Sequence, residues 1–264
     1  MRKITICRLC LREAPLQSSH LIPRAVYREI RASKNQNPNP VLVTSDVVKP
    51  VSRQVVRHLL CSDCEQMLNK NGERDVMQIM RRRSGSFPLQ SFLKSIEPHV
   101  QSPTVKIYRG HPKIDELVYF ASSVFWRASV TKWQISMGSS LSLELGPYEE
   151  LLRSFLLSVG GFPSGLSMGI QMVTNPMLQQ MARFPALRRE LGIRVFNFQI
   201  PGIQFSLWAG KHQPETHMNF CAARTGSIFV HPDLERENLL GLVKTFGDLT
   251  LGGRIHRNYK SLRC

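Results

Sequence analysis

Acidic residues are scarce in this chain. The 264 residues include 19 Asp and Glu against 35 Lys and Arg, which gives a formal net charge of +16. A positive field of this size raises the local concentration of polyanions, so we expect nucleic acid as the partner. An anionic membrane surface is the competing partner. Because the sequence offers no amphipathic helix with a clean basic face, we do not expect membrane binding.

Long apolar runs are also missing. No stretch approaches the roughly 18 residues of a membrane span. The opening MRKITICRLCLRE begins with basic residues, but Arg8 and Arg12 interrupt its apolar part, which is not typical of a secretory signal. These absences favour a cytoplasmic location, where thiols stay reduced.

Cysteine is too infrequent for a disulfide scaffold, with six residues in the whole chain. A hydrophobic content of 42% is normal for a globular protein and allows a core without such staples. Cys221 and Cys264 are isolated, and we interpret them as a small buried side chain and part of a frayed terminus. The other four form two Cys-x2-Cys pairs, Cys7 with Cys10 and Cys61 with Cys64.

The excess of basic residues is concentrated near the start of the sequence. Residues 1–83 contain 16 Lys and Arg and 7 Asp and Glu, a net charge of +9, which leaves +7 for residues 84–264. We find no internal repeat. The stretch 95–105 is similar to a linker, so we predict a zinc-bearing module over 1–90 and a second domain over 91–264.

The first module is predicted to mix short strands and helices. Pro23 disfavours helix before it and suits the first turn of a helix that we expect to reach about Arg31. Residues 33–40 form a polar loop, and 41–60 are expected to form a hairpin of two strands separated by Pro50. We predict a strand within 1–12 and a helix over 61–83, whose weakest point is the sequence NKNG.

The second domain is predicted to be α+β, with helices packed on a small antiparallel sheet. Residues 194–210 alternate in polarity and are expected to turn at Pro201–Gly202. We predict helices over 114–133, 148–162, 185–193 and 237–246, and a further strand over 226–232.

The two cysteine pairs indicate a zinc site. In each pair the short spacing directs both thiolates at one ion, and four thiolates complete a closed, tetrahedral, structural site. The intervening residues 11–60 are more than the loop of a zinc ribbon, which has about 15–20 residues. Four unrelated cysteines or a redox pair are the alternatives.

The order of three motifs, CRLC, SSHLIPR and LLCSDCEQMLNKNGE, resembles the zinc-bearing branch of the HNH, or ββα-metal, endonucleases. The resemblance covers residues 1 to about 80. It implies hydrolysis of nucleic-acid phosphodiester bonds, with His20 as the general base and a helix that supplies ligands to a catalytic divalent ion such as Mg²⁺. The structural zinc is a separate site.

One position departs from that pattern. The residue beside the histidine often binds the catalytic ion in this family, but here it is Ser19, a weaker ligand. We expect Glu65 to replace it, with Asn69 as a second ligand; Glu73 shares their helix face at i, i+4 and i+8. The alternatives are a carboxylate that stabilises the helix N-terminus, for Glu65, and a turn former, for Asn69.

Basic side chains near this site are expected to contact phosphates, and double-stranded DNA is the expected partner. Arg24, Arg28 and Arg31 would form a stripe on one helix, and Arg81 and Arg82 belong to a second cluster. His58 is an alternative fifth ligand or phosphate contact, or an ordinary histidine at a strand end.

Three functions remain open from the sequence. The first is a metal-dependent endonuclease. The second, motivated by Ser19, is a nucleic-acid-binding protein that has lost cleavage. The third is a zinc-stapled scaffold of a larger assembly.

Overall fold

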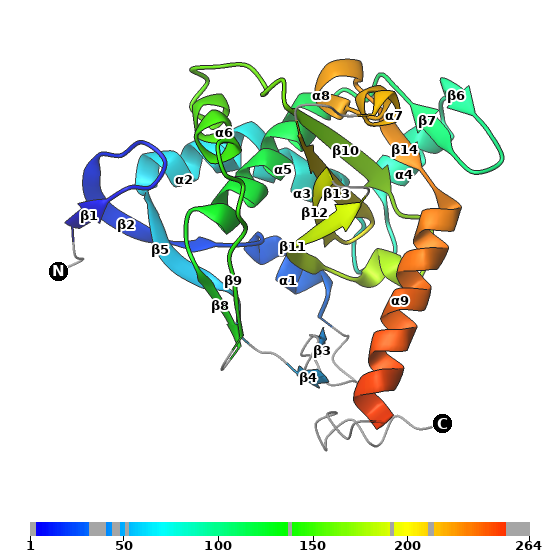
Figure 1. The fold of residues 1–264 in the computed structure, drawn as a ribbon, viewed down its shortest axis with the longest axis horizontal. Helices are drawn as coiled ribbons and strands as arrows, with labels where there is room; N and C mark the ends of the chain where they lie inside the picture. Colours follow the sequence, from blue (N-terminus) through cyan, green and yellow to red (C-terminus); the bar gives the residue numbers. More distant parts are fainter. Residues whose placement is uncertain are drawn as a thin grey trace.

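The computed structural model describes residues 4–31, 41–43, 48–50, 53–136, 139–190, 193–210 and 214–251. A small N-terminal sheet lies at one end of the molecule, and a larger sheet forms the other part (Figure 1). The architecture is mixed α+β, as predicted. None of the helices in the described ranges has the length and apolar character needed to cross a membrane.

The N-terminal sheet leads directly into a helix. It has the strand order β1 (Ile4–Ile6), β2 (Glu13–His20), β5 (Val56–Cys61), with antiparallel neighbours. The helix is continuous from α2 (Ser62–Leu68) through the π-helix η1 (Asn69–Glu73) into α3 (Arg74–Ile79). The sequence NKNG, the predicted weak point, therefore forms a wider π-helical turn and does not end the helix. The helix ends at Ile79, four residues before the predicted end at Arg83.

Two local predictions in this region need correction. The helix α1 (Arg24–Glu29) begins after Pro23 but ends before Arg31. The predicted hairpin also has a different composition: β3 (Val41–Val43) pairs with β4 (Val48–Pro50), while β5 pairs with β2. Pro50 is tolerated because it ends a strand of a two-stranded sheet, where no further strand needs its missing N–H. The loop predicted over 33–40 lies outside the described residues.

Seven strands form the larger sheet, so the prediction of a small sheet was wrong in size. All neighbours are antiparallel except β10 and β14. In the order of the sheet, the strands are β11 (Arg183–Glu190), β12 (Ile193–Ile200), β13 (Ile203–Ala209), β10 (Leu166–Met172), β14 (Ile228–Val230), β7 (Lys106–Tyr108) and β6 (Val100–Gln101).

The predicted hairpin at Pro201–Gly202 and the strand at β14 are confirmed. Gly202 has a φ of +81°, a conformation that glycine adopts without strain. The helix predicted over 185–193 was wrong, because this segment pairs with β12 as the edge strand β11. Pairing with a neighbour overrides the helix propensity of its Leu and Arg residues.

Helix α5 (Ile114–Ser129) is the central helix of the molecule (Figure 1). Every residue from Leu117 to Ala128 is buried. The other helices are α4 (Pro88–Lys94), α6 (Tyr148–Leu156), η2 (Leu178–Gln180), α7 (Glu215–Asn219), α8 (Ala222–Thr225) and α9 (Pro232–Leu251), and β8 (Trp133–Ser136) with β9 (Ser139–Leu141) forms a hairpin. Three predicted helices therefore correspond to α5, α6 and α9.

Helix α5 joins the two parts of the chain. A Cβ added to Gly72 on η1 would lie 2.9 Å from the backbone nitrogen of Phe120 and 3.1 Å from the carbonyl oxygen of Glu116. The two helices therefore touch backbone to backbone. The larger cluster of buried apolar side chains extends from Cys7 to Val230, across residue 90. The division into domains 1–90 and 91–264 stays a prediction.

Candidate metal centre and catalytic site

The four paired cysteines converge at one point. Their Sγ atoms all lie within 4.8 Å of one another, and the Sγ atoms of Cys10 and Cys61 are 3.8 Å apart. A tetrahedral zinc site with Zn–S bonds of about 2.3 Å requires sulfur separations of about 3.8 Å. The cluster is therefore placed to hold a metal ion such as zinc.

Local backbone geometry directs the four thiols toward one point. The first pair lies in a tight turn, in which the Cys7 N–H donates to the Arg12 carbonyl at 2.9 Å and Leu11 has a φ of +61°. In the second pair, Cys61 is the N-cap of α2 and its N–H donates to Cys7 Sγ at 3.3 Å. A hydrogen bond from the Cys64 thiol lowers the pKa of Cys7 to about 4, so a thiolate forms readily here.

The cysteine turn is also held by the C-terminal part of the chain. Arg153 on α6 donates to the Leu9 carbonyl at 2.8 Å and is itself held by Glu150 at 2.7 and 2.6 Å. A hydrogen bond to Cys10 raises the pKa of Arg12, which also lies 3.6 Å from Asp63. These cations partly offset the negative charge of the thiolates. Of the lone cysteines, Cys221 is buried, as predicted, and Cys264 lies outside the described residues.

His20 ends strand β2, opposite Val56 of β5. Its ring is half-buried, and its Nε2 lies 2.6 Å from Gln54 Oε1. Because an amide oxygen only accepts hydrogen bonds, this contact requires the proton on Nε2. The neutral ring then presents Nδ1 as the nitrogen that can take a proton.

Two buried oxygens near the predicted catalytic site have no hydrogen-bond partner. They are Oε1 of Glu65 on α2 and Oγ of Ser19 on β2, and Ser19 is only 2% exposed. Buried polar atoms in folded proteins are almost always paired. Carboxylate and hydroxyl oxygens are both of the kind that a hard divalent ion binds.

Glu73 connects these groups electrostatically. Burial raises the pKa of Glu73, Arg127 opposes that shift, and smaller contributions come from Glu65 and His20. The Arg127 guanidinium lies 4.0 Å from the Glu73 carboxylate. The helix thus brings Glu65 and Glu73 to one side with His20, whereas Asn69 is exposed.

The ligand atoms of His20, Glu65 and Glu73 do not form a compact cluster, unlike those of the four cysteines. Among the described residues, only the four cysteines bring three or more His, Cys, Asp or Glu ligand atoms within 4.8 Å of one another. His20 and Glu65 therefore do not form a closed ligand set by themselves.

Two residues at this site were missed from the sequence. Gln54 gave no signal, because it lies in a segment read only as strand. Arg127 did carry one: it is a lone cation within the apolar stripe of α5. A charge at such a position needs a buried partner, and here the partners are at His20 and Glu73.

The two predicted basic clusters lie next to each other. Arg82 pairs with Glu29 at the end of α1 at 3.6 Å, and the backbone N–H of Arg83 donates to the same carboxylate at 2.7 Å. On α1, Arg24 and Arg28 are exposed, and Arg31 lies beyond its end, so the stripe on this helix has two members. The Arg81 guanidinium folds back onto the Arg82 carbonyl at 3.4 Å. His58 is exposed on β5, opposite Ser18.

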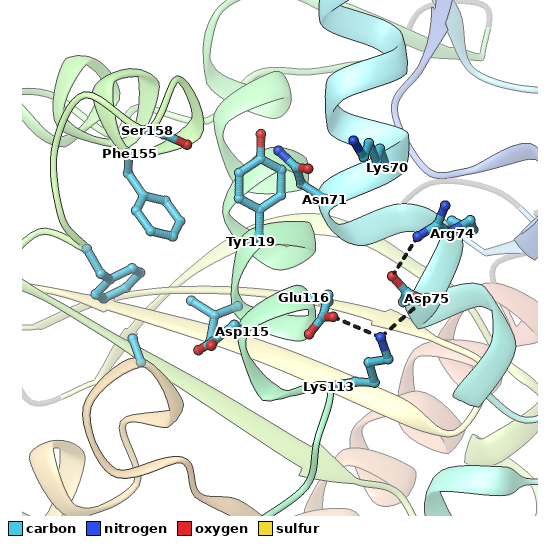
Figure 2. A pocket seen from close by; sticks show the side chains of 13 residues that line it. Lys70, Asn71, Arg74, Asp75, Lys113, Asp115, Glu116, Tyr119, Phe155 and Ser158 are labelled. Carbon is cyan, nitrogen blue, oxygen red and sulfur yellow. Dashed lines mark hydrogen bonds and ion pairs between the residues drawn. The ribbon is translucent and has the colours of Figure 1, made fainter.

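A cleft of about 610 Å³ lies beside η1, α3 and the start of α5. Figure 2 shows Asp75 between Arg74 and Lys113, at 3.5 and 3.6 Å, and Glu116 pairs with the same lysine at 3.0 Å. Neither His20 nor Glu65 lines this cleft. Because several of its charges neutralise one another, the cleft has no strong preference for an anion.

No protein-family model, curated protein or solved structure matches this chain. Function is therefore inferred from its own residues.

Proposed function

We propose that this protein is a metal-dependent endonuclease of the HNH type that hydrolyses phosphodiester bonds in DNA. One observation carries the proposal. His20 ends β2, the neighbouring strand β5 leads directly into α2, and that helix carries Glu65, whose Oε1 is buried without a hydrogen-bond partner. An imidazole and a carboxylate on one ββα unit would supply a base and a metal ligand for phosphodiester hydrolysis.

His20 acts as the general base. Its Nδ1 takes a proton from the attacking water, while Gln54 Oε1 holds the proton on Nε2 and so fixes the ring's tautomer and orientation. After the transfer the ring is a cation. The negative charge of Glu73 stabilises that cation, since the two groups attract each other.

Glu65 would hold the divalent ion, assisted by the Ser19 hydroxyl, whereas the exposed Asn69 does not join them. When bound, the ion supplies positive charge that stabilises the phosphoryl group and the leaving oxygen. The four-cysteine centre is assigned to structural zinc. Four thiolates leave no open coordination position, so this zinc takes no part in the chemistry.

The DNA partner is inferred from charge. Arg24 and Arg28 are exposed on α1, immediately after His20, and the segment with Arg81 and Arg82 lies beside the end of the same helix. In a protein with a net charge of +16, these side chains would contact the phosphates on both sides of the reacting bond. Phosphate contacts position the duplex without reading its sequence.

A second function is favoured by Ser19. Its hydroxyl is neutral and buried, and a site without a stronger ligand at this position would bind nucleic acid without cutting it. The third possibility, a zinc-stapled scaffold, predicts no affinity for nucleic acid. Salt-sensitive DNA binding separates these two alternatives from each other.

The test is nicking of supercoiled plasmid with Mg²⁺, Mn²⁺ or Ni²⁺. We expect His20→Ala to lower the rate by roughly 10²- to 10⁴-fold, the usual contribution of a general base. His99→Ala changes an exposed histidine outside the N-terminal sheet, and as the control it should keep wild-type activity. Inactive wild type with all three ions, or equal rates for wild type and His20→Ala, would refute the proposal.

A further inference from the structure

Arg127 is a full positive charge in the interior of the protein. Its side chain lies on α5 within the C-terminal part of the chain, and the residue is 1% exposed. A buried guanidinium is costly unless its N–H groups find acceptors. The acceptors that the guanidinium contacts therefore indicate the role of this buried charge.

The guanidinium reaches from α5 to the candidate catalytic site. Its NH1 donates to the backbone carbonyl of His20 at 2.8 Å. On the opposite edge, Nε donates to the Ser123 carbonyl at 3.3 Å, and NH2 donates to the Ser123 hydroxyl at 3.2 Å. NH2 also lies 4.0 Å from Glu73 Oε2. The planar group thus connects β2, η1 and α5.

The backbone of Arg127 is fixed as well. Its carbonyl accepts a hydrogen bond from the Trp133 indole N–H at 2.8 Å, and Trp133 is completely buried. The main chain from which the guanidinium projects is therefore held in place. A hydrogen bond from this guanidinium restrains the main chain at His20, where β2 ends and the turn into α1 begins.

We propose that Arg127 is a positioning residue of the His20 site, through which helix α5 of the C-terminal part fixes the general base relative to Glu73. The proposal rests on the function inferred above for His20. It implies that residues beyond the HNH-like segment complete the active site. Lysine cannot replace arginine fully here, because one ammonium group cannot span the His20 carbonyl and both Ser123 oxygens in a plane.

Arg224 on α8 provides the control. Its NH2 also donates to backbone carbonyls, those of Ser164 at 2.7 Å and Leu166 at 2.9 Å. The described contacts of Arg224 involve neither the cysteine turn nor His20 and Glu73. Arg224→Met thus removes a link from a guanidinium to backbone carbonyls that does not reach either candidate site.

The experiment measures plasmid nicking by full-length Arg127→Met, Arg127→Lys and Arg224→Met, with zinc content and thermal unfolding as checks of folding. We expect Arg127→Met to lower kcat by roughly 10- to 100-fold with KM for DNA almost unchanged, because misplacement of a base affects the chemical step. Arg127→Lys should recover part of this loss, and Arg224→Met should keep the wild-type kcat. Unchanged kcat in folded Arg127→Met, or an equal loss in Arg224→Met, would overturn the proposal.

If Arg127→Met does not fold, Ser123→Ala replaces it. This variant keeps the guanidinium and removes one of its supports, and we expect a smaller fall in kcat with unchanged KM. A wild-type kcat in Ser123→Ala together with full activity of Arg127→Lys would contradict the proposal.

A second readout separates this inference from the proposed function. If the wild type does not nick DNA, the endonuclease assignment fails, but the position of His20 can still be followed by NMR. The His20 ring signals, assigned by their loss in His20→Ala, should shift in Arg127→Lys while those of His58 stay in place. Unchanged His20 signals would show that Arg127 does not position this residue.

Discussion

Strands β2 and β5 pair between two sites: Cys61 of the four-cysteine centre lies at one end of the paired segment, and His20 lies at the other. The two sites differ in how their residues are brought together. The cysteine ligands come from one tight turn and from the start of helix α2, and their Sγ atoms have already converged within 4.8 Å. The His20 site takes its groups from β2, α2, η1 and α5, and two of its oxygens lack partners. The metal centre is therefore assembled by local backbone geometry, whereas the His20 site depends on packing between segments that are distant in the sequence.

Loss of the cysteine centre should have the largest effect. Removing zinc by a chelator, or replacing Cys64 with Ser, should abolish stoichiometric zinc and unfold the N-terminal sheet, because structural zinc sites contribute about 10 kcal/mol or more to folding. Metal analysis and thermal unfolding measure both effects. Cys221→Ser, which changes a buried cysteine outside the cluster, should retain one zinc per chain. A Cys64→Ser protein with wild-type zinc content would show that Cys64 is not a ligand of the metal centre.

Glu65→Gln should affect the other site alone. An amide is a weaker ligand than a carboxylate for a hard divalent ion, so the Mg²⁺ concentration needed for half-maximal nicking should rise by about tenfold or more. Zinc content should stay the same. Asp63→Asn is the control, because it removes an exposed carboxylate from the same helix turn. An equal change in metal requirement for Asp63→Asn would remove Glu65 from the site.

Gly72→Ala tests the packing on which the His20 site depends. The added Cβ would meet backbone atoms of α5 at 2.9 and 3.1 Å, and backbone cannot move aside as a flexible side chain can. Overpacking of this kind costs about 1–3 kcal/mol, measurable by urea unfolding, and nicking should fall while zinc is retained. Gly161→Ala, where nothing lies within 4 Å, should leave both unchanged. Equal effects of the two substitutions would contradict the close contact.

The smallest expected effect concerns Glu73. Burial raises the pKa of its carboxyl above the usual value, so ionisation in the folded state costs free energy. Stability from this residue is greatest at acidic pH and falls as pH rises through its folded-state pKa. Glu73→Gln should therefore raise the free energy of unfolding near pH 7, with the difference vanishing below the usual Glu pKa of about 4.3. A Gln variant that is less stable at pH 7 would show that the ion pair with Arg127 outweighs burial.

Sequence spacing was sufficient for the cysteine centre. A Cys-x2-Cys turn directs both thiols by local backbone geometry, so Cys7, Cys10, Cys61 and Cys64 could be assigned to one site without knowledge of the fold. His20, between these pairs, and Glu65, directly after the second pair, were predicted through the family resemblance. Their environment could not be found in this way, because Gln54 and Arg127 reach His20 only through the folded structure.

The fold was predictable to a similar extent. Helix α5 has a clear apolar pattern, and the turn residues Pro201 and Gly202 mark the hairpin of β12 and β13. Strand β10 is buried at every position, so it lacks the alternation by which a half-exposed strand is found. The edge strand β11 shows the opposite difficulty, since its local preference for helix is reversed only by pairing with β12.

The most direct test combines metal analysis and plasmid nicking on the same preparations of wild type and His20→Ala. We expect one zinc per chain in both proteins, and nicking that requires added Mg²⁺ or Mn²⁺ and is lost in His20→Ala. Equal nicking by the two proteins, or zinc-loaded wild type that does not cut with any of these ions, would contradict the assignment of His20 as the general base of an endonuclease.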